Sequence, residues 1–400
     1  MNRFQITRFP LQGKIVLVRV DYDVPLKNNK VADNHRIIES LPTIKFLLNR
    51  DCKIVLAGHV GRPNGKIVKE LSVRPIGNEL KKLLPSTKIT VFNDSIGKEI
   101  KDKISKGKPQ EIFLLENLRY YQEEEQNDPA FAHSLASLAE VYINNAFANS
   151  HRKHASMVAI TQFLPALAGL TVEKEILNLS KALRPNRPAV WLLGGAKLDK
   201  VDLISSALER ADYVLIGGAL AFSFLKAKKI PVGTSLISRE SVRAAQTILK
   251  QRAANKLILP IDFVIAESFS SKARSSIVLY NQIKHHQIGL DLGPETIELF
   301  KSYLQKAQTI VWNGPLGYFE WAKFSKSTKE LGRFIGRLTA FSICGGGETS
   351  ESLKKFHLQH NISHFSTAGG AAVKFLSGKP LDAITALENN YQKFKQKIRL

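Results

Sequence analysis

Short apolar segments alternate with helical segments along most of the chain, and this alternation constrains the fold more than any other feature. In the first half, Ile15–Val20 and Lys53–Ala57 have the composition of buried strands, and residues 37–48 between them carry apolar side chains at helical spacing. Further strands are predicted at 112–115 and 141–144, with a helix near 130–139. Strands that are apolar along their whole length are typical of parallel sheets covered by helices on both faces.

A second alternating series follows residues 184–188, RPNRP, whose two prolines interrupt any regular element. A helix is predicted over 167–183, just before this break. The predicted strands of the second series are 189–193, 213–216, 257–265, 309–312 and 341–344. We therefore predict an α/β protein with an N-terminal domain over 1–166, an interdomain helix over 167–185 and a second parallel domain over 186–379.

Composition narrows the possible functions without selecting one. The 400 residues exceed what one hydrophobic core usually serves, which agrees with two domains. The net charge of +23 favours nucleic acid, acidic surfaces or phosphorylated metabolites, but the basic residues are spread along the chain and are equally explained by solvated faces. Cys52 and Cys344 follow no metal-binding spacing, and no run of about 18 apolar residues occurs. We expect a cytoplasmic protein without membrane segments.

Basic residues follow the predicted strands of the first half. They are Arg36, His59, Arg62, Arg119, His151 and Arg152. Because the carboxyl ends of parallel strands lie at one edge of a sheet, these side chains are expected to converge on an anion with several negative groups. Each arginine alone is explained equally well as a surface charge, so the prediction depends on the set. Asp21 is expected to orient an arginine or to accept a substrate hydroxyl.

Glycines follow the predicted strands of the second half, most clearly in GGGETS after residues 341–344. The other glycine-rich strand ends are 194–197, 217–219, 289–294, 313–317 and 367–371. A strand, a glycine turn and a helix start expose backbone N–H groups that bind phosphate, although one such loop alone can simply pack a helix on a sheet. Six of them predict a nucleotide site, with Lys197 and Lys200 adding charge and Glu348 reaching Mg²⁺. Neither Walker nor G-x-G-x-x-G spacing occurs at these strand ends.

The same segments resemble, in order, the signature blocks of the phosphoglycerate kinase family. The blocks are VRVDYDVPL, GHVGRP, LLENLRYY, NNAFANSHRKHAS, LLGGAK, LPIDFVIA, GLDLGPET, VWNGPLGYFE, GGGET and STAGGAA. The resemblance extends from about residue 13 to 387. It implies two Rossmann-like domains joined by a helix and hinge, with the segment from about 380 to 400 packing back on the N-terminal domain. It also implies a monomer that closes its domains to carry out Mg²⁺-dependent phosphoryl transfer between 1,3-bisphosphoglycerate and ADP, giving 3-phosphoglycerate and ATP.

The resemblance also implies roles for individual residues. The positions that match 3-phosphoglycerate contacts are Asp21, Tyr22, Asp23, Arg36, His59, Val60, Gly61, Arg62, Arg119 and Arg152. The positions that match nucleotide contacts are Gly195, Ala196, Lys197, Lys200, Gly218, Gly289, Asn313, Glu320, Gly346, Gly347, Glu348 and Thr349. Arg36 and Lys197 are expected to flank the transferred phosphoryl group as catalytic cations, with Mg²⁺ near Glu348.

Several positions depart from the family pattern. Asp23 stands where the family has asparagine, Asn145 where it has aspartate, and Glu348 where it has the metal-binding aspartate. Ala148, Asn149 and Ser150 replace Gly-Thr-Ala, and Ala219 and Ala368 replace glycines. Lys200 follows Lys197 by three positions instead of four, which changes its direction on a helix by about 100°.

These departures leave two alternatives to an active kinase. One is a paralogue that keeps the fold and binds nucleotide or phosphoglycerate with weak or no turnover. The other, from a different class, is a protein that binds nucleic acid through its net charge of +23. No aromatic RNA-binding motif supports this alternative.

Overall fold

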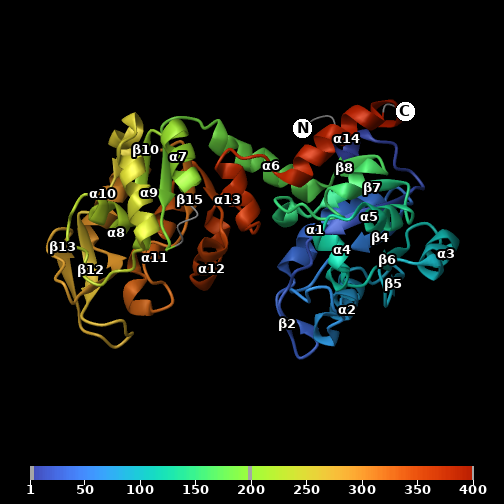
Figure 1. Ribbon diagram of the computed structural model, residues 1–400, viewed down its shortest axis with the longest axis horizontal. Helices are drawn as coiled ribbons and strands as arrows, with labels where there is room; N and C mark the ends of the chain where they lie inside the picture. The colour runs from blue at the N-terminus through green and yellow to red at the C-terminus, as the bar shows by residue number, and fades with distance from the viewer. Residues whose placement is uncertain (1–3, 197–200, 399–400) are drawn as a thin grey trace. The chain divides into compact units, whose positions relative to one another are not determined.

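The computed structural model describes residues 4–196 and 201–398, with side chains described as far as residue 394. The chain separates into two compact units. Unit 1 contains Met1–Ile176 and Pro380–Leu400, and unit 2 contains Leu177–Lys379. Each unit has its own parallel sheet with helices packed against it, so the predicted α/β class is confirmed (Figure 1).

Unit 1 is built on a six-stranded parallel sheet in the order β5-β6-β4-β1-β7-β8. The strands are β1 (Ile15–Val20), β4 (Lys53–Ala57), β5 (Ile89–Val91), β6 (Ile112–Leu114), β7 (Val141–Asn145) and β8 (Ala166–Ala168). Val16 of β1 pairs with Ile54 of β4 and Val141 of β7, and all three side chains are buried. A two-stranded hairpin, β2 (Leu26–Lys27) and β3 (Lys30–Val31), follows the first strand.

Helices cover the sheet of unit 1 because each presents a stripe of apolar side chains. In α1, Ile37, Ile44 and Leu47 are buried at helical spacing. The α-helices of this unit are α1 (His35–Leu48), α2 (Arg74–Leu83), α3 (Lys98–Lys106), α4 (Gln122–Glu125), α5 (Pro129–Ala136) and α14 (Asp382–Ile398). Short 3-10 helices are η1 (Ile6–Arg8), η2 (Lys69–Leu71), η3 (Leu118–Tyr120), η4 (Phe147–Asn149) and η5 (Ala159–Gln162).

The helix predicted from residue 167 begins later in the structure. Residues 166–168 form the edge strand β8, and α6 (Leu170–Leu183) starts after Gly169. The Asn145 Oδ1 atom accepts hydrogen bonds from the Thr43 hydroxyl at 2.8 Å and from the Thr171 N–H at 3.1 Å. It thereby satisfies an N–H of the first turn of α6, which has no acceptor within the helix. Pairing of residues 166–168 with β7 overrides their apolar helical pattern.

Unit 2 contains a second six-stranded parallel sheet in the order β11-β10-β9-β15-β16-β17. The strands are β9 (Ala189–Leu193), β10 (Tyr213–Ile216), β11 (Leu257–Ile258), β15 (Thr309–Asn313), β16 (Phe341–Cys344) and β17 (His364–Phe365). The helices are α7 (Val201–Arg210), α8 (Gly218–Ala227), α9 (Arg239–Leu249), α10 (Pro294–Leu304), α11 (Lys326–Ile335), α12 (Gly347–Lys355), α13 (Gly370–Leu376), η6 (Arg252–Lys256), η7 (Ala322–Phe324) and η8 (Gln359–Asn361).

The second domain contains the predicted parallel sheet and also a small antiparallel sheet that the sequence did not indicate. The segment predicted as one strand over 257–265 is divided into β11 and β12 (Asp262–Ala266). Pro260, which lacks an N–H, lies at the break. β12 belongs to a separate antiparallel sheet, β13-β12-β14, with β13 (Ser275–Leu279) and β14 (Ile288–Leu292). Gly289, predicted in a strand-end loop, therefore lies inside β14.

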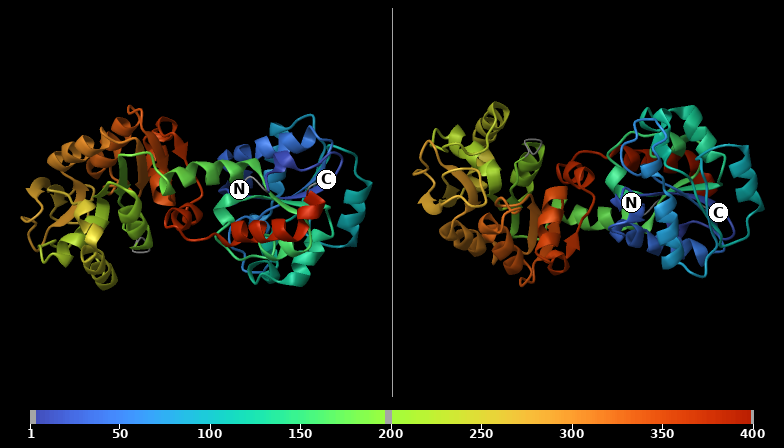
Figure 2. Two further views of the ribbon diagram at one scale, coloured as in Figure 1. Left: turned by 90° about the horizontal axis from the view of Figure 1, so that it is seen from above. Right: turned by 90° about the horizontal axis from the view of Figure 1, so that it is seen from below.

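The helix α14 returns the chain to unit 1 and packs beside β8 (Figure 2). Asn390 of this helix is buried and bonds three backbone groups. Its Oδ1 accepts from the Ala166 N–H at 2.8 Å, and its Nδ2 donates to the carbonyls of Thr161 at 2.6 Å and Leu164 at 2.8 Å. No described helix is long and apolar enough to cross a membrane.

We predict that Asn390→Ala destabilises unit 1 by about 2–4 kcal/mol, because three buried backbone groups lose their partner. Urea unfolding followed by circular dichroism measures this change. Asn389→Ala, which alters the exposed neighbour on the same helix, is the matched control and should change stability by less than about 0.5 kcal/mol. Equal effects of the two substitutions would contradict the anchoring role of Asn390.

Candidate active site

The predicted site residues of unit 1 follow four adjacent strands of one sheet. β6, β4, β1 and β7 are neighbours and run parallel, so their carboxyl ends share one edge. Asp21 and Asp23 follow β1, His59 to Arg62 follow β4, Arg119 follows β6 and Arg152 follows β7. The structure therefore brings these predicted residues to the same edge of the sheet.

Two carboxylates at this edge hold the loops in place. Asp21 Oδ1 accepts hydrogen bonds from Arg36 Nη1 at 3.3 Å and Asn149 Nδ2 at 3.0 Å. Asp23 Oδ1 accepts from the Gly61 N–H at 2.9 Å, and the backbone carbonyl of Asp23 accepts from Arg36 Nη1 at 3.0 Å. Arg36 is thus oriented by the segment after β1, as the sequence predicted for an arginine near Asp21.

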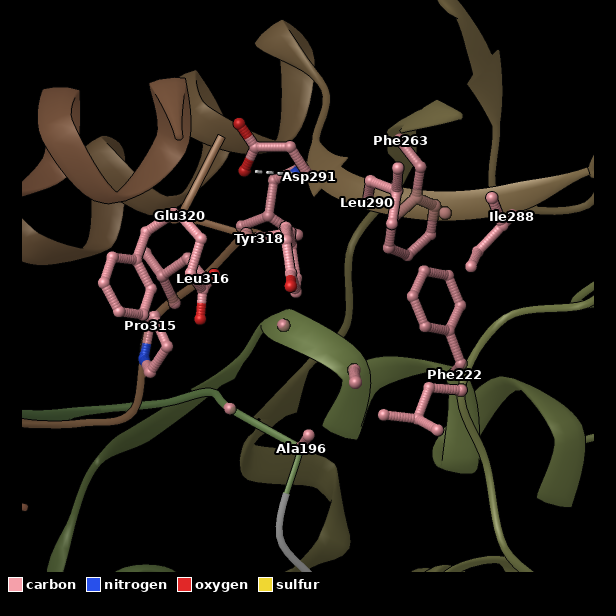
Figure 3. A pocket seen from close by; sticks show the side chains of 18 of the residues that line it. Ala196, Phe222, Phe263, Ile288, Leu290, Asp291, Pro315, Leu316, Tyr318 and Glu320 are labelled. Atoms are coloured by element: carbon pink, nitrogen blue, oxygen red, sulfur yellow. Dashed lines mark hydrogen bonds between the residues drawn. The ribbon is translucent and has the colours of Figure 1, made fainter. Parts of the chain in front are cut away.

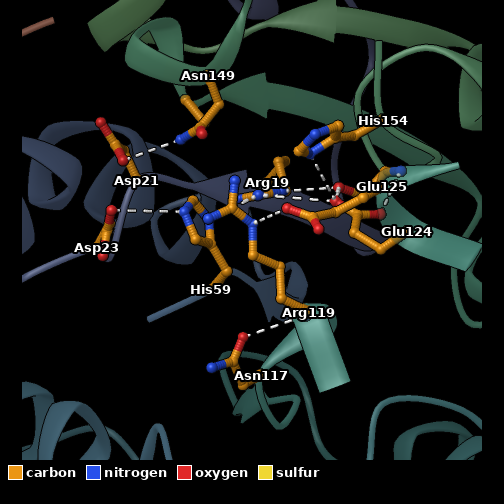
Figure 4. Close-up of polar contacts among 12 residues, drawn as sticks. Arg19, Asp21, Asp23, His59, Asn117, Arg119, Glu124, Glu125, Asn149 and His154 are labelled. Atoms are coloured by element: carbon orange, nitrogen blue, oxygen red, sulfur yellow. Dashed lines mark hydrogen bonds and ion pairs between the residues drawn. The ribbon is translucent and has the colours of Figure 1, made fainter. Parts of the chain in front are cut away.

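The ring of His59 is 1% exposed and has a defined tautomer. Arg19 Nη2 lies 3.1 Å from His59 Nδ1, and since a guanidinium can only donate, Nδ1 accepts and the ring proton is on Nε2. The Nε2 atom faces Asp23 Oδ2 at 3.6 Å (Figure 4). Burial, with Arg19 and Arg119 nearby, lowers the pKa of His59 to about 3, so the ring is neutral at physiological pH.

Arg119 is nearly buried, and not all of its N–H groups have a hydrogen-bond acceptor among the described residues. Its Nη1 donates to the Gly61 carbonyl at 2.9 Å and its Nε lies 3.2 Å from Glu125 Oε1, whereas the buried Nη2 has no hydrogen-bond partner among the described residues. Burial and the charge of Arg152 lower the pKa of Arg119 to about 10, which leaves it protonated at neutral pH. Arg62 is exposed and Arg152 is half-buried. Three arginines can therefore direct N–H groups at an anion.

Tyr22 and Val60, both matched to substrate positions by the family resemblance, have buried side chains. The Tyr22 hydroxyl lies 2.9 Å from Ser40 Oγ, and burial raises the pKa of this tyrosine. The Val60 carbonyl accepts from Asn117 Nδ2 at 2.8 Å. In this structure both side chains support the loops instead of lining their surface.

Sequence reasoning missed Arg19, Glu124 and Asn149. Arg19 and Glu124 are completely buried and lie 3.8 Å apart, and Asn149 bonds Asp21. A charged side chain inside the apolar strand IVLVRV was the available signal for Arg19, because a buried charge requires a partner. Nothing in the sequence indicated which of the glutamates at 123–125 is that partner.

In unit 2, the glycine-rich loops meet at the carboxyl edge of β10, β9, β15 and β16, which are also adjacent and parallel. Backbone hydrogen bonds link these loops. The Gly195 N–H donates to the Pro315 carbonyl at 2.7 Å and the Gly218 N–H to the Leu316 carbonyl at 3.1 Å. A Cβ on Gly218, whose φ is +59°, would lie 2.6 Å from the Gly195 nitrogen. The sequence pattern predicts that these two amides bind a phosphate. In the structure they instead bond the loops to each other.

A cavity of about 380 Å³ opens between these loops and the antiparallel sheet. One side carries Phe222, Phe263, Ile288 and Leu290, and the other carries Pro315, Leu316, Tyr318 and Glu320 (Figure 3). It unites six predicted nucleotide residues: Gly195, Ala196, Gly218, Gly289, Glu320 and Glu348. A mostly apolar cavity with a few polar groups is suited to a flat heterocyclic base.

A second cavity of about 440 Å³ lies at the start of α12. It is lined by the predicted residues Asn313, Gly346, Gly347, Glu348 and Thr349, and by residues that the sequence did not indicate, Asp202, Lys374 and Lys379. Glu348 lines both cavities. Gly346 precedes α12 with φ +109°, a conformation that favours glycine, and the first N–H groups of α12 have no acceptor within the helix. Lys197 and Lys200 lie outside the described residues.

The donor set at the second cavity fits a magnesium ion carried by phosphates. Asn313 Oδ1 is a buried oxygen without a hydrogen-bond partner among the described residues, because its Nδ2 is directed at the Gly345 carbonyl at 2.6 Å. Glu348 contributes a carboxylate to the same cavity. Within 4–196 and 201–394, no group of three or more His, Cys, Asp or Glu side chains is placed to hold a metal. Mg²⁺ typically takes one or two protein oxygens and completes its shell with phosphates and water.

Comparisons with known proteins assign the family. Residues 6–379 match the sequence profile of the family described as phosphoglycerate kinase. The chain is 41% identical over 391 residues to the phosphoglycerate kinase of Moorella thermoacetica, covering 97% of this chain and 99% of the relative. It is 41% identical over 385 residues to that of Dictyoglomus turgidum, covering 95% and 96%. The chain belongs to the phosphoglycerate kinase family.

Solved structures of family members agree with this assignment. The phosphoglycerate kinase from Coxiella burnetii superposes with a TM-score of 0.88 at 34% identity, covering 98% of this chain and all of that one. The enzyme from Pyrococcus horikoshii superposes with a TM-score of 0.83 at 30% identity, over 98% and 100%. The family makes the chain a kinase, and the predicted two-domain α/β architecture is that of these structures.

Asp23 and Ala219, two departures from the phosphoglycerate kinase pattern, have defined surroundings in the structure. Although burial opposes it, the adjacent His59, the hydrogen bond from the Gly61 N–H and the nearby Arg36 hold the pKa of Asp23 well below its usual range. The extra carboxylate is therefore ionised and held by the loop after β4. Ala219 lines the first cavity next to Gly218.

Asp291 is a buried carboxyl in the wall of the first cavity. It accepts hydrogen bonds from the Leu292 N–H at 2.9 Å and from the N–H of Ser327, at 3.2 Å, and it also bonds the Ser327 hydroxyl. It thus ties β14 to the first turn of α11. Burial outweighs these bonds and raises the pKa of Asp291 to about 7.

We predict that Asp291 makes unit 2 less stable as pH rises. A carboxyl whose pKa is raised on folding stabilises the protein below its unfolded pKa, near 4, and loses this contribution as pH rises through about 7. Asp291→Asn removes the titration, so its melting temperature relative to the unmodified protein should increase between pH 5 and pH 8. Scanning calorimetry at both pH values measures this, and a pH-independent difference would refute it.

Proposed function

We propose that this kinase transfers a phosphoryl group reversibly between 1,3-bisphosphoglycerate and ADP, giving 3-phosphoglycerate and ATP. The observation that carries the proposal is that the two sheets gather different kinds of residue at their carboxyl edges. The carboxyl edge of one sheet gathers Arg36, Arg62, Arg119 and Arg152, and that of the other surrounds an apolar cavity continuous with glycine loops and Glu348. Identity of 41% to named phosphoglycerate kinases over 97% of the chain supports it.

In unit 1, the arginines bind the acid substrate. Arg119 Nη2 has hydrogen-bonding capacity for a phosphate or carboxylate oxygen, and Arg62 adds an exposed guanidinium. The Asp21 carboxylate and the Asp23 backbone carbonyl accept hydrogen bonds from Arg36. The guanidinium of Arg36 is therefore oriented before substrate binds. The carboxylates of Asp21 and Asp23 also accept the 2-hydroxyl of phosphoglycerate.

In unit 2, the first cavity takes the base and ribose, with Glu320 at the ribose end, and the second takes the phosphates. Glu348 and Asn313 would hold Mg²⁺, which would neutralise charge on the bridging phosphate oxygens. Lys197 belongs to the segment directly after β9 and its charge is proposed to meet the same phosphates. We also propose that the protein acts as a monomer in the cytoplasm.

The reaction needs no general base, because the attacking oxygen is already ionised as a carboxylate or a phosphate. The chain contributes positioning and charge neutralisation, which are the principal means of catalysing phosphoryl transfer. Arg36 is the cation on the acid-substrate side, and its two bonds to the segment after β1 limit its reorganisation during transfer.

We predict that Arg36→Ala lowers kcat roughly 100- to 1,000-fold, as expected for loss of one preorganised cationic donor. A coupled assay with 3-phosphoglycerate, ATP and Mg²⁺ measures turnover. Arg50→Ala is the matched control, since Arg50 follows the other end of α1 and stacks on Phe46, and its kcat should be unchanged. Near-full turnover of Arg36→Ala would contradict the assigned role, and no turnover by the unmodified protein would favour a binding paralogue.

We predict that Glu348→Gln raises the Mg²⁺ concentration needed for half-maximal turnover at least about tenfold, because the neutral amide is a weaker ligand. Titration with Mg²⁺ at fixed nucleotide concentration measures this change. Glu351→Gln, on the next turn of α12 and also lining the first cavity, is the control and should leave the Mg²⁺ requirement unchanged.

Glu348→Asp tests the effect of the longer side chain at this position. Higher activity of the variant would mean that the loop has diverged from the family, and lower activity would mean that the site has adapted to glutamate.

A further inference from the structure

A buried ion pair lies beneath the acid-substrate edge of unit 1. Arg19 of β1 and Glu124 of α4 are both 0% exposed, and Arg19 Nη2 lies 3.8 Å from Glu124 Oε1. Neither residue reaches the surface where substrate would bind. Burying two charges is costly unless every polar atom is satisfied, and such a pair is weak evidence for a purely stabilising role.

Ser156 completes the bonding of this pair. Its hydroxyl donates to Glu124 Oε1 at 2.6 Å and accepts from Arg19 Nε at 2.8 Å, while its N–H donates to Glu124 Oε2 at 2.9 Å. Arg19 Nη1 donates to the Val20 carbonyl. Both carboxylate oxygens and two of the three guanidinium nitrogens are thus held, and the remaining Nη2 is directed at His59 Nδ1 (Figure 4).

This arrangement determines the state of the histidine. Because Arg19 can only donate, His59 Nδ1 must accept, and the ring presents Nε2–H toward Asp23. The charged and titratable groups that face His59 are Arg19 from β1, Asp23 from the loop after β1, Arg119 from η3 and His154 from the loop after η4. Two permanent cations and burial keep the ring neutral.

We propose that Glu124 and Arg19 are positioning residues for the acid substrate: Glu124 holds the Arg19 fork, and the fork fixes the tautomer of His59 at the substrate edge. The identity of the substrate in this inference rests on the proposed function, but the tautomer of His59 can be measured without turnover. The consequence is that His59 presents a donor, Nε2–H, toward Asp23 at the substrate edge.

The test is the paired variant Arg19→Met with Glu124→Gln, which removes both buried charges together and so avoids leaving one uncompensated. Without Arg19, Nδ1 of His59 loses its donor and the ring should populate both neutral tautomers. Burial still keeps the ring neutral, so the tautomer is the quantity that changes. Nitrogen-15 NMR of histidine-labelled full-length protein reports tautomer and protonation directly, with His59→Gln used to identify the signal. The unmodified protein should show one Nε2–H form from pH 5.5 to 8.

Kinetics supply the second readout. In the paired variant, KM for 3-phosphoglycerate should rise about tenfold at pH 7.5 with kcat within about threefold of the unmodified value. Lys88→Met with Glu111→Gln removes another ion pair of unit 1, at the amino ends of β5 and β6, and should change neither readout.

The outcomes separate the two proposals. A single Nε2–H signal of His59 in the folded paired variant, or a KM equal to that of the unmodified protein, would overturn the positioning role. Absence of turnover in the unmodified protein would count against the proposed function alone, because the NMR result stands without it. If the paired variant does not fold, Ser156→Ala, which removes one bond from each partner, should give a smaller KM increase and a minor population of the other His59 tautomer.

Discussion

The parallel pairing of the central strands is the constraint on which both candidate sites depend. In unit 1, β6, β4, β1 and β7 are adjacent, and in unit 2, β10, β9, β15 and β16 are adjacent. Since all run the same way, each sheet collects at one edge the loops of strands that are distant in the sequence. The loops at the two edges differ in residue type, with arginines in one unit and glycines with Glu348 in the other.

Charge burial gives the arginine edge its rigidity. Arg19 is part of the strand and cannot leave it without breaking the pairing of β1 with β4 and β7. Its bonds to Ser156 and His59 therefore fix these two residues relative to the strand. Asp23 and Gly61 form a similar link between the loops after β1 and β4. Preorganised groups of this kind are what phosphoryl transfer requires, because little bond-making chemistry is left to the protein.

The fold and the surface residues of the sites could largely be predicted from sequence, whereas their supports could not. Apolar runs such as Ile15–Val20 and glycine turns such as that before α12 carry local signals, so the strand ends and their loops were correctly placed. Glu124 and Asp202 carry none, because their importance comes from partners far along the chain. The strand predicted over 257–265 failed for a different reason: only tertiary pairing shows that the chain leaves one sheet at Pro260 and enters another.

The position of Glu348 follows from the burial of its neighbour. Thr349 is 1% exposed, and its hydroxyl accepts from the Gly314 N–H at 2.6 Å and donates to the Gly345 carbonyl at 3.1 Å. These bonds anchor the first turn of α12 to the loop after β15, so the helix cannot shift to accommodate a longer acid. With about 100° between successive residues, burying Thr349 turns Glu348 toward the two cavities. The extra methylene relative to aspartate must therefore be absorbed by the side chain within those cavities.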